Sequence, residues 1–116
     1  MLKLLAFLSK KKDIEMQTFI EYYEKTHVPL ILRLASTPLV YKRRYLRRDD
    51  PLNKEDGEAG FDVVTELGFL DRAAFLAWQA QLSAPGAGEQ VAADEAKFLD
   101  RARTRAYVVE ECVTSG

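Results

Sequence analysis

The stretch Phe19-Ile-Glu-Tyr-Tyr-Glu-Lys-Thr-His-Val-Pro-Leu30 decides how the first half of the chain folds. Around it, apolar residues recur at three- and four-residue steps, which is the spacing of the buried face of an amphipathic helix. The members of this stripe are Met16, Ile20, Tyr23, His27, Leu30 and Leu34. The only histidine of the chain therefore belongs to the face that points into the core.

Pro29 interrupts this helical pattern. Proline lacks the backbone donor of a helical residue and disfavours helical geometry in the residue before it. We therefore expect one helix that is capped by Asp13 and ends within residues 25–27, followed by a shorter helix over residues 29–35. His27 would lie at the junction, where backbone groups are unpaired and a side chain can face a cavity.

Strand and helix patterns alternate along the rest of the chain. Apolar segments predict strands at residues 2–9, 39–47, 61–69 and 104–113, and amphipathic segments predict helices at 71–82 and 89–100, the first capped by Asp71. A polar loop over residues 49–60 is long enough to be a mobile flap. The order strand, helix, strand, strand, helix, strand is that of an α+β, ferredoxin-like βαββαβ sandwich, with an antiparallel four-stranded sheet and helices on one face.

Both faces of the predicted sheet carry apolar side chains. Successive residues of a strand point to opposite faces, so the first strand places Leu4 and Leu8 on one face and Leu5 and Phe7 on the other. The helices of one chain can cover only one face. Packing two such sheets face to face in a homodimer is the simplest way to cover the other.

Composition narrows the class of protein. The 116 residues predict a single domain (1–116), and 47% hydrophobic with 30% charged residues is typical of a globular protein. Cys112 is the only cysteine, so no disulfide within the chain is expected. The apolar run at residues 1–8 is interrupted by Lys3 and followed by lysines, the reverse of a signal peptide. We expect no membrane segment and a cytoplasmic location.

One segment is strongly basic: residues 42–48 contain five Lys or Arg and also Tyr45. A basic stripe with an aromatic side chain can bind nucleic acid, whereas positive charge also protects an exposed strand edge from pairing. The formal net charge of −1 and the nearby acidic residues Asp49, Asp50 and Glu55 favour the edge strand. No nucleic-acid partner is expected.

Several motifs resemble those of the EthD family of small dimeric α+β barrel proteins, over nearly the whole chain. They are Phe7-Leu-Ser9, Phe19-x-x-Tyr22-Tyr23-x-x-x-His27-x-Pro29-Leu30, Tyr41 with Tyr45, and Ala93-Asp94-Glu95-x-x-Phe98-Leu99-Asp100 leading into Val108-Val109-Glu110-Glu111. The resemblance implies a homodimer whose two sheets form a barrel, with a pocket between sheet and helices in each subunit. Some relatives act as decarboxylases, dehydratases or cyclases on aromatic polyketides, and the wider superfamily includes cofactor-free quinol monooxygenases and haem enzymes. The family motif places its histidine at His27.

Acid–base chemistry on a phenolic or β-keto substrate needs a proton acceptor, a donor that polarises the substrate oxygen, and a pocket poor in water. His27 is the candidate catalytic residue, and Tyr23, Tyr41 and Tyr45 are candidate substrate-binding donors. Glu66 interrupts an apolar strand and either faces the pocket, where it would orient the imidazole, or faces solvent. Each of these side chains also has a purely structural interpretation in the core or at its rim.

Other chemistries find less support in the sequence. One His and one Cys cannot supply a zinc site, so no metal is expected, and glycines in phosphate-binding spacing are absent. A single axial histidine leaves haem binding open as a minor alternative. We expect cofactor-free lyase- or cyclase-like chemistry on a small apolar or aromatic molecule, or alternatively a protein that binds and carries such a metabolite without catalysis.

Overall fold

The computed structural model describes residues 1–55 and 60–116, so the predicted loop at 49–60 lies partly outside the described residues. The elements follow the predicted order and form a βαββαβ sandwich. They are β1 (Leu2–Leu8), α1 (Met16–Tyr22), η1 (Tyr23–His27), α2 (Val28–Leu34), β2 (Val40–Tyr45), β3 (Val63–Phe69), α3 (Arg72–Ser83), α4 (Ala87–Phe98), η2 (Arg101–Arg103) and β4 (Arg105–Val109). In the described part of the chain, no helix is long and apolar enough to cross a bilayer.

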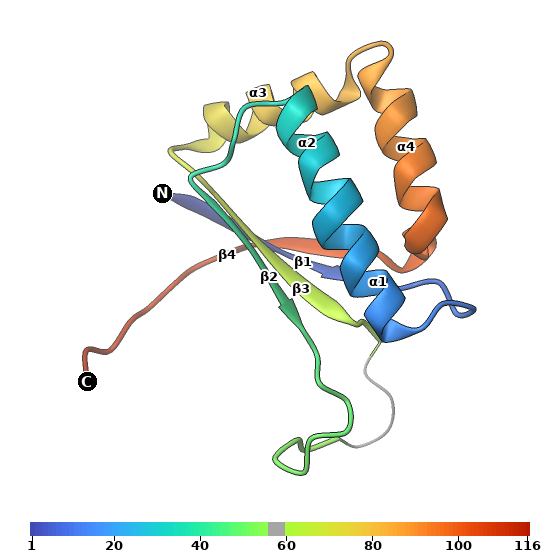
Figure 1. Ribbon diagram of the computed structural model, residues 1–116. Helices are drawn as coiled ribbons and strands as arrows, with labels where there is room; N and C mark the ends of the chain where they lie inside the picture. The colour runs from blue at the N-terminus through green and yellow to red at the C-terminus, as the bar shows by residue number, and fades with distance from the viewer. Residues whose placement is uncertain (56–59) are drawn as a thin grey trace.

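The four strands form one antiparallel sheet in the order β2-β3-β1-β4, as the ferredoxin-like fold requires. Figure 1 shows the helices on one side of this sheet, with the C-terminal residues leading away from it. Each strand is shorter than predicted at one or both ends. The cap of α3 is confirmed, since the Asp71 carboxylate accepts from the backbone N–H of Ala74 at 2.8 Å.

Helical segments lie on both sides of the junction before Pro29, as predicted, but the predicted break between them is wrong. The chain stays helical from Met16 to Leu34, and residues 23–27 widen into a π-helical turn. Pro29 falls in the first turn of α2, and the N–H of Val28 bonds to the carbonyl of Tyr23, five residues back. Pro29 has no backbone N–H to donate. The wider turn lets the residue before it bond five residues back, so the helix continues past Pro29. The prediction that Asp13 caps the first helix is wrong, because α1 begins two residues later with Glu15 at its N-cap.

Two clusters of buried apolar side chains fill the space between helices and sheet. The first consists of Leu8, Phe19, Tyr23, Val28, Val63, Phe98 and Leu99, and the second of Leu4, Leu67 and Phe69. Tyr41 packs against both clusters. Tyr41 therefore lies where the two halves of the core meet.

The opposite sheet face, which we call the outer face, also carries apolar side chains. Strand pairing places Leu5 opposite Tyr107, and Phe7 opposite Val64, with Val109 on the same face. Phe7 makes edge contacts with Phe61 and Tyr107 at ring-centroid distances of 5.0 and 6.1 Å. Tyr107 is 57% exposed, so this apolar face is open to solvent in the single chain.

A candidate acid–base site between the helices and the sheet

His27 is the last residue of the π-helical turn and is only 6% exposed. Its imidazole packs against the rings of Tyr23 and Phe98, at centroid distances of 5.4 and 5.0 Å. π-Helical turns are rare and are found frequently at functional sites. The turn thus holds the only histidine of the chain in an aromatic environment poor in water.

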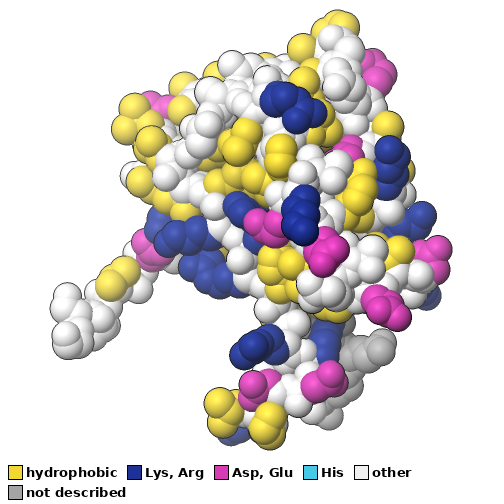
Figure 2. All heavy atoms as spheres, viewed as in Figure 1, with side chains coloured by type: hydrophobic (Ala, Val, Ile, Leu, Met, Phe, Trp, Pro, Cys, Tyr) yellow, Lys and Arg dark blue, Asp and Glu magenta, His cyan; other side chains and the backbone are white. Residues whose placement is uncertain are grey.

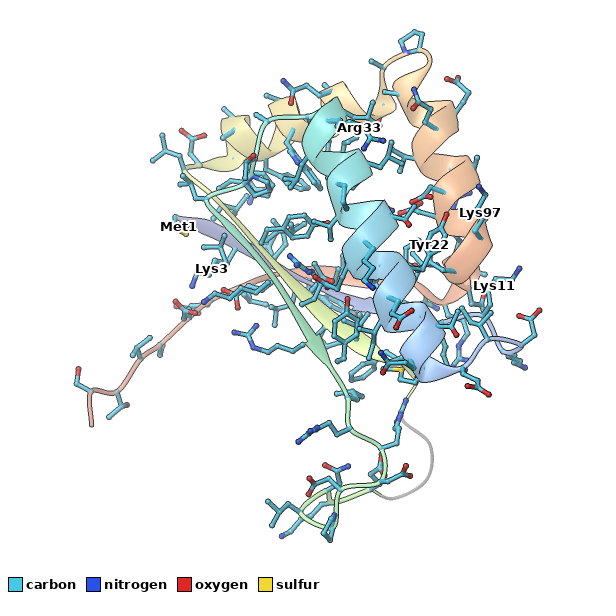
Figure 3. All side chains as sticks on the ribbon, viewed as in Figure 1. Met1, Lys3, Lys11, Tyr22, Arg33 and Lys97 are labelled. Atoms are coloured by element: carbon cyan, nitrogen blue, oxygen red, sulfur yellow. The ribbon has the colours of Figure 1, made fainter. Side chains whose placement is uncertain are left out.

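Asp94 on α4 is the hydrogen-bonding partner of this imidazole. Its Oδ2 lies 2.8 Å from His27 Nδ1, and its Oδ1 accepts a hydrogen bond of 2.5 Å from the hydroxyl of Tyr22. Figure 3 labels Tyr22, whose side chain extends from α1 toward α4. The carboxylate is 7% exposed and is therefore held from two sides in a nearly dry setting.

The hydrogen bonds to Asp94 determine which imidazole nitrogen carries the proton. Burial, together with the Asp94 carboxylate, raises the pKa of Tyr22 to about 12, so the phenol is protonated at neutral pH and donates. An ionised carboxylate only accepts, so Nδ1 of His27 must donate to it. The lone pair of the neutral imidazole is then on Nε2. None of the residues in the described ranges hydrogen-bonds this atom.

A second group of polar side chains lies between η1 and the sheet. The hydroxyls of Tyr23 and Thr65 are 2.6 Å apart, and the ring of Tyr45 packs against that of Tyr23 at 5.9 Å. Burial raises the pKa of Tyr23 to about 12. The Tyr23 hydroxyl is therefore a neutral group in the core at physiological pH.

Glu24 joins this group to the edge strand. Arg43 donates to both of its carboxylate oxygens, at 2.6 and 2.9 Å, and Tyr45 donates to one of them at 2.5 Å. The guanidinium of Arg43 holds the pKa of Glu24 below its usual value, and burial raises the pKa of Tyr45. Arg43 also lies over the ring of Tyr41, 4.7 Å from its centroid. These contacts tie β2 to the π-helical turn.

The structure brings together only some of the predicted site residues. Tyr23 contacts His27 directly, whereas Tyr45 contacts Tyr23 and Tyr41 packs against the same core cluster. Glu66 does not orient the imidazole, and the pocket-facing interpretation of this residue is wrong. It lies on the outer face with Lys3 and Arg44, at 3.3 and 2.8 Å, and Arg44 lowers the pKa of its carboxyl group.

The strand pattern explains the position of Glu66, and the helix pattern explains the position of Asp94. Thr65 and Leu67 face the helices, so Glu66 between them faces the other way. Asp94 had no predicted role. It follows Val91 by three residues and precedes Phe98 by four, so it lies on the buried stripe of α4. An acidic residue on an apolar stripe is the signal that could have revealed it.

Two open hollows lie on the outer face, away from His27. The first, of about 460 Å³, is lined by Phe7, Gly60, Phe61, Arg103, Arg105 and Tyr107. The second, of about 510 Å³, is lined by residues that include Glu66 and Cys112. Within residues 1–55 and 60–116, no group of three or more His, Cys, Asp or Glu side chains is arranged to hold a metal ion.

Comparison with known proteins identifies the family. The sequence profile of the EthD domain matches residues 11–102, which span α1 to α4 and include both His27 and Asp94. The chain belongs to the EthD family. No curated protein sequence matches it.

Solved structures of EthD and related proteins share the fold. A crystal structure of an EthD family protein from Bacillus halodurans is 22% identical, with a TM-score of 0.62 over 97% of this chain and 100% of that one. The protein At3g17210 from Arabidopsis thaliana is 14% identical, with a TM-score of 0.68 over 99% of both chains. A NIPSNAP domain protein from Burkholderia xenovorans is 12% identical, with a TM-score of 0.63 over 100% of this chain and 99% of that one. Across these divergent sequences, the likeness establishes the ferredoxin-like fold alone.

Proposed function

We propose that this EthD family protein is a homodimeric, cofactor-free enzyme that uses His27 as a general base on a small apolar or aromatic, polyketide-like substrate. The observation that carries the proposal is the hydrogen bond of 2.8 Å between His27 Nδ1 and the buried Asp94. This contact orients the ring and leaves Nε2 as the basic atom, without a partner among the described side chains. A carboxylate that holds an imidazole in this way stabilises the imidazolium formed when Nε2 takes a proton.

The chemistry is proton transfer at a carbon next to a carbonyl group. Nε2 removes the proton, the electron pair of the broken bond passes to the carbonyl oxygen as an enolate, and the imidazolium returns the proton to the product. Cyclisation and dehydration of β-keto compounds proceed through an enolate formed in this way. In decarboxylation the enolate forms when the bond to the carboxylate breaks and CO₂ leaves, and the imidazolium of His27 supplies the proton that the carbon then takes up. The aromatic rings of Tyr23 and Phe98 beside the imidazole suit an apolar or aromatic substrate.

His27→Gln separates catalysis from binding. Glutamine can still donate to Asp94 but cannot act as a base near neutral pH, so turnover should fall by about 10²- to 10⁴-fold while the fold is kept. The assay follows CO₂ release from aryl β-keto acids and ring formation from linear tetraketides. Glu21→Gln, an exposed change on α1, is the matched control. Turnover that survives in His27→Gln would contradict the proposal.

The alternative is a binding or carrier protein of the same fold. The aromatic rings in contact with His27 suit an apolar ligand whether or not chemistry follows. A carrier would bind the tetraketide stoichiometrically in wild type and in His27→Gln, without turnover in either. Haem binding would instead produce a visible absorbance band that His27→Gln removes.

A further inference from the structure

Trp78 on α3 carries an unpaired polar atom in the interior. Its indole Nε1 is buried and has no hydrogen-bond acceptor, and it is the one such side-chain atom in the described ranges. Buried donors in native proteins are almost always paired, because a donor removed from water without an acceptor costs free energy. Packing of the indole ring against Phe69 and Phe75 explains the apolar part of Trp78, but it does not account for an unpaired N–H. An acceptor atom of a bound molecule would pair this N–H.

The indole lies in the half of the core next to Tyr41. Its ring packs against Phe69 and Phe75, at centroid distances of 5.3 and 6.3 Å, and against the Leu4, Leu67 and Phe69 cluster. Tyr41 packs against the same cluster and also against the cluster of Tyr23, the residue in contact with His27. His27 and Trp78 are thus connected through one continuous set of aromatic and aliphatic side chains between the helices and the sheet.

We propose that Trp78 Nε1 donates a hydrogen bond to an oxygen atom of the ligand bound at the His27 site, an inference that rests on the proposed function. An indole N–H only donates, so the ligand atom must be an acceptor. The surroundings are apolar and the indole is neutral, so a ketone or phenol oxygen fits there better than a carboxylate. The ligand class is therefore an elongated, neutral aromatic or polyketide-like molecule with a carbonyl or phenol oxygen remote from the atom that His27 deprotonates.

Trp78 is the only tryptophan of the chain, so its indole N–H gives a single resonance in a ¹H–¹⁵N spectrum. The test compares two probes of similar shape, 4-phenyl-2-butanone and n-butylbenzene, of which only the first has a carbonyl oxygen. The ketone should move the indole resonance downfield, as a new hydrogen bond does, and n-butylbenzene should not. An indole resonance that stays in place at saturating ketone, or a ketone that does not bind at millimolar concentration, would overturn the inference.

Trp78→Phe tests the same bond by affinity, measured by calorimetry. Phenylalanine keeps the aromatic packing but lacks the donor, so the ketone should bind about 3- to 10-fold more weakly while n-butylbenzene binds equally well. Leu76→Ala, an exposed change on the same helix, is the control. If Trp78→Phe does not fold, the resonance of the wild-type protein still decides the question.

His27→Gln distinguishes failure of this inference from failure of the proposed function. If the ketone shifts the indole resonance in wild type and in His27→Gln but no substrate is turned over, the ligand contact stands and the catalytic proposal falls. If turnover depends on His27 while the indole resonance never moves, the catalytic proposal stands and the role of Trp78 is wrong.

Discussion

Asp94 is the residue on which the geometry of the site depends, because it bonds both His27 and Tyr22. In Asp94→Asn the amide can donate to Nδ1, which would place the imidazole proton on Nε2 and remove its basic lone pair. We expect kcat to fall about 10- to 100-fold with little change in KM, because Asp94 positions the base and does not touch the substrate. Steady-state kinetics checks this, and an unchanged kcat would remove Asp94 from the mechanism.

Tyr23 gives the protein an alkaline limit to stability. Burial raises its pKa from 10.0 to about 12, so the unfolded chain loses the phenol proton at a lower pH than the folded chain does. Stability is therefore lost as pH rises from about 10 to about 12. Tyr23→Phe should remove this part of the loss and, at neutral pH, cost about 1 to 3 kcal/mol because Thr65 loses its buried partner. Urea unfolding at pH 7 and pH 11 measures both effects.

At the scale of elements, the π-helical turn positions the site. It lies between α1 and α2 and ends at His27, two residues before Pro29. In Pro29→Ala the restored N–H lets an ordinary α-helical pattern continue through residues 23–27, which would rotate His27 away from Asp94. The fold should persist with stability within about 1 kcal/mol, while turnover and ligand affinity fall.

Nuclear magnetic resonance can follow this rearrangement, since the signals of the single imidazole report its contact with Asp94. The exposed change Arg33→Ala, on the same helix, is the control and should leave those signals in place. If the imidazole signals and ligand affinity of Pro29→Ala match the wild type, Pro29 does not maintain the turn.

At the scale of the whole molecule, the two sheet faces differ in what covers them. The helices pack on one face, with Lys/Arg and Asp/Glu side chains mixed over the surface that Figure 2 shows. The outer face bears Phe7, Tyr107 and Val109 with no helix over it. We propose that a second copy covers this face, as a homodimer.

Charge on the outer face should break this dimer. Phe7→Lys or Val109→Lys would bury a cation in the apolar interface, so the protein should become monomeric and its melting temperature should fall by about 5 °C or more. Leu76→Lys, on exposed α3, should change neither property. Sedimentation equilibrium at micromolar concentration measures the assembly, and a wild-type protein that is purely monomeric there would refute the proposal.

Much of the fold could be predicted because hydrophobic periodicity is a local property. Steps of three and four residues indicated the helices, alternation indicated the strands, and their order alone pointed to the ferredoxin-like sandwich. The inward direction of His27 and the apolar outer face followed from the same patterns. The start of α1 did not follow from these patterns. The residues after the lysine run form a turn in which the Ile14 N–H bonds to the Lys11 carbonyl, so the helix begins later than predicted.

The candidate site was decided by the tertiary structure. Asp94 reaches His27 from a helix 67 positions further along the chain, and no local pattern states which buried acid meets which buried base. The outward position of Glu66 depends on which set of alternate residues of β3 faces the helices. The indole N–H of Trp78 is seen to be unpaired only when its neighbours are packed around it. Sequence by itself determined the order of the elements and the apolar residues on their buried faces. Packing of distant segments decided which buried residues meet, because hydrogen-bond partners are selected by three-dimensional proximity and not by spacing along the chain.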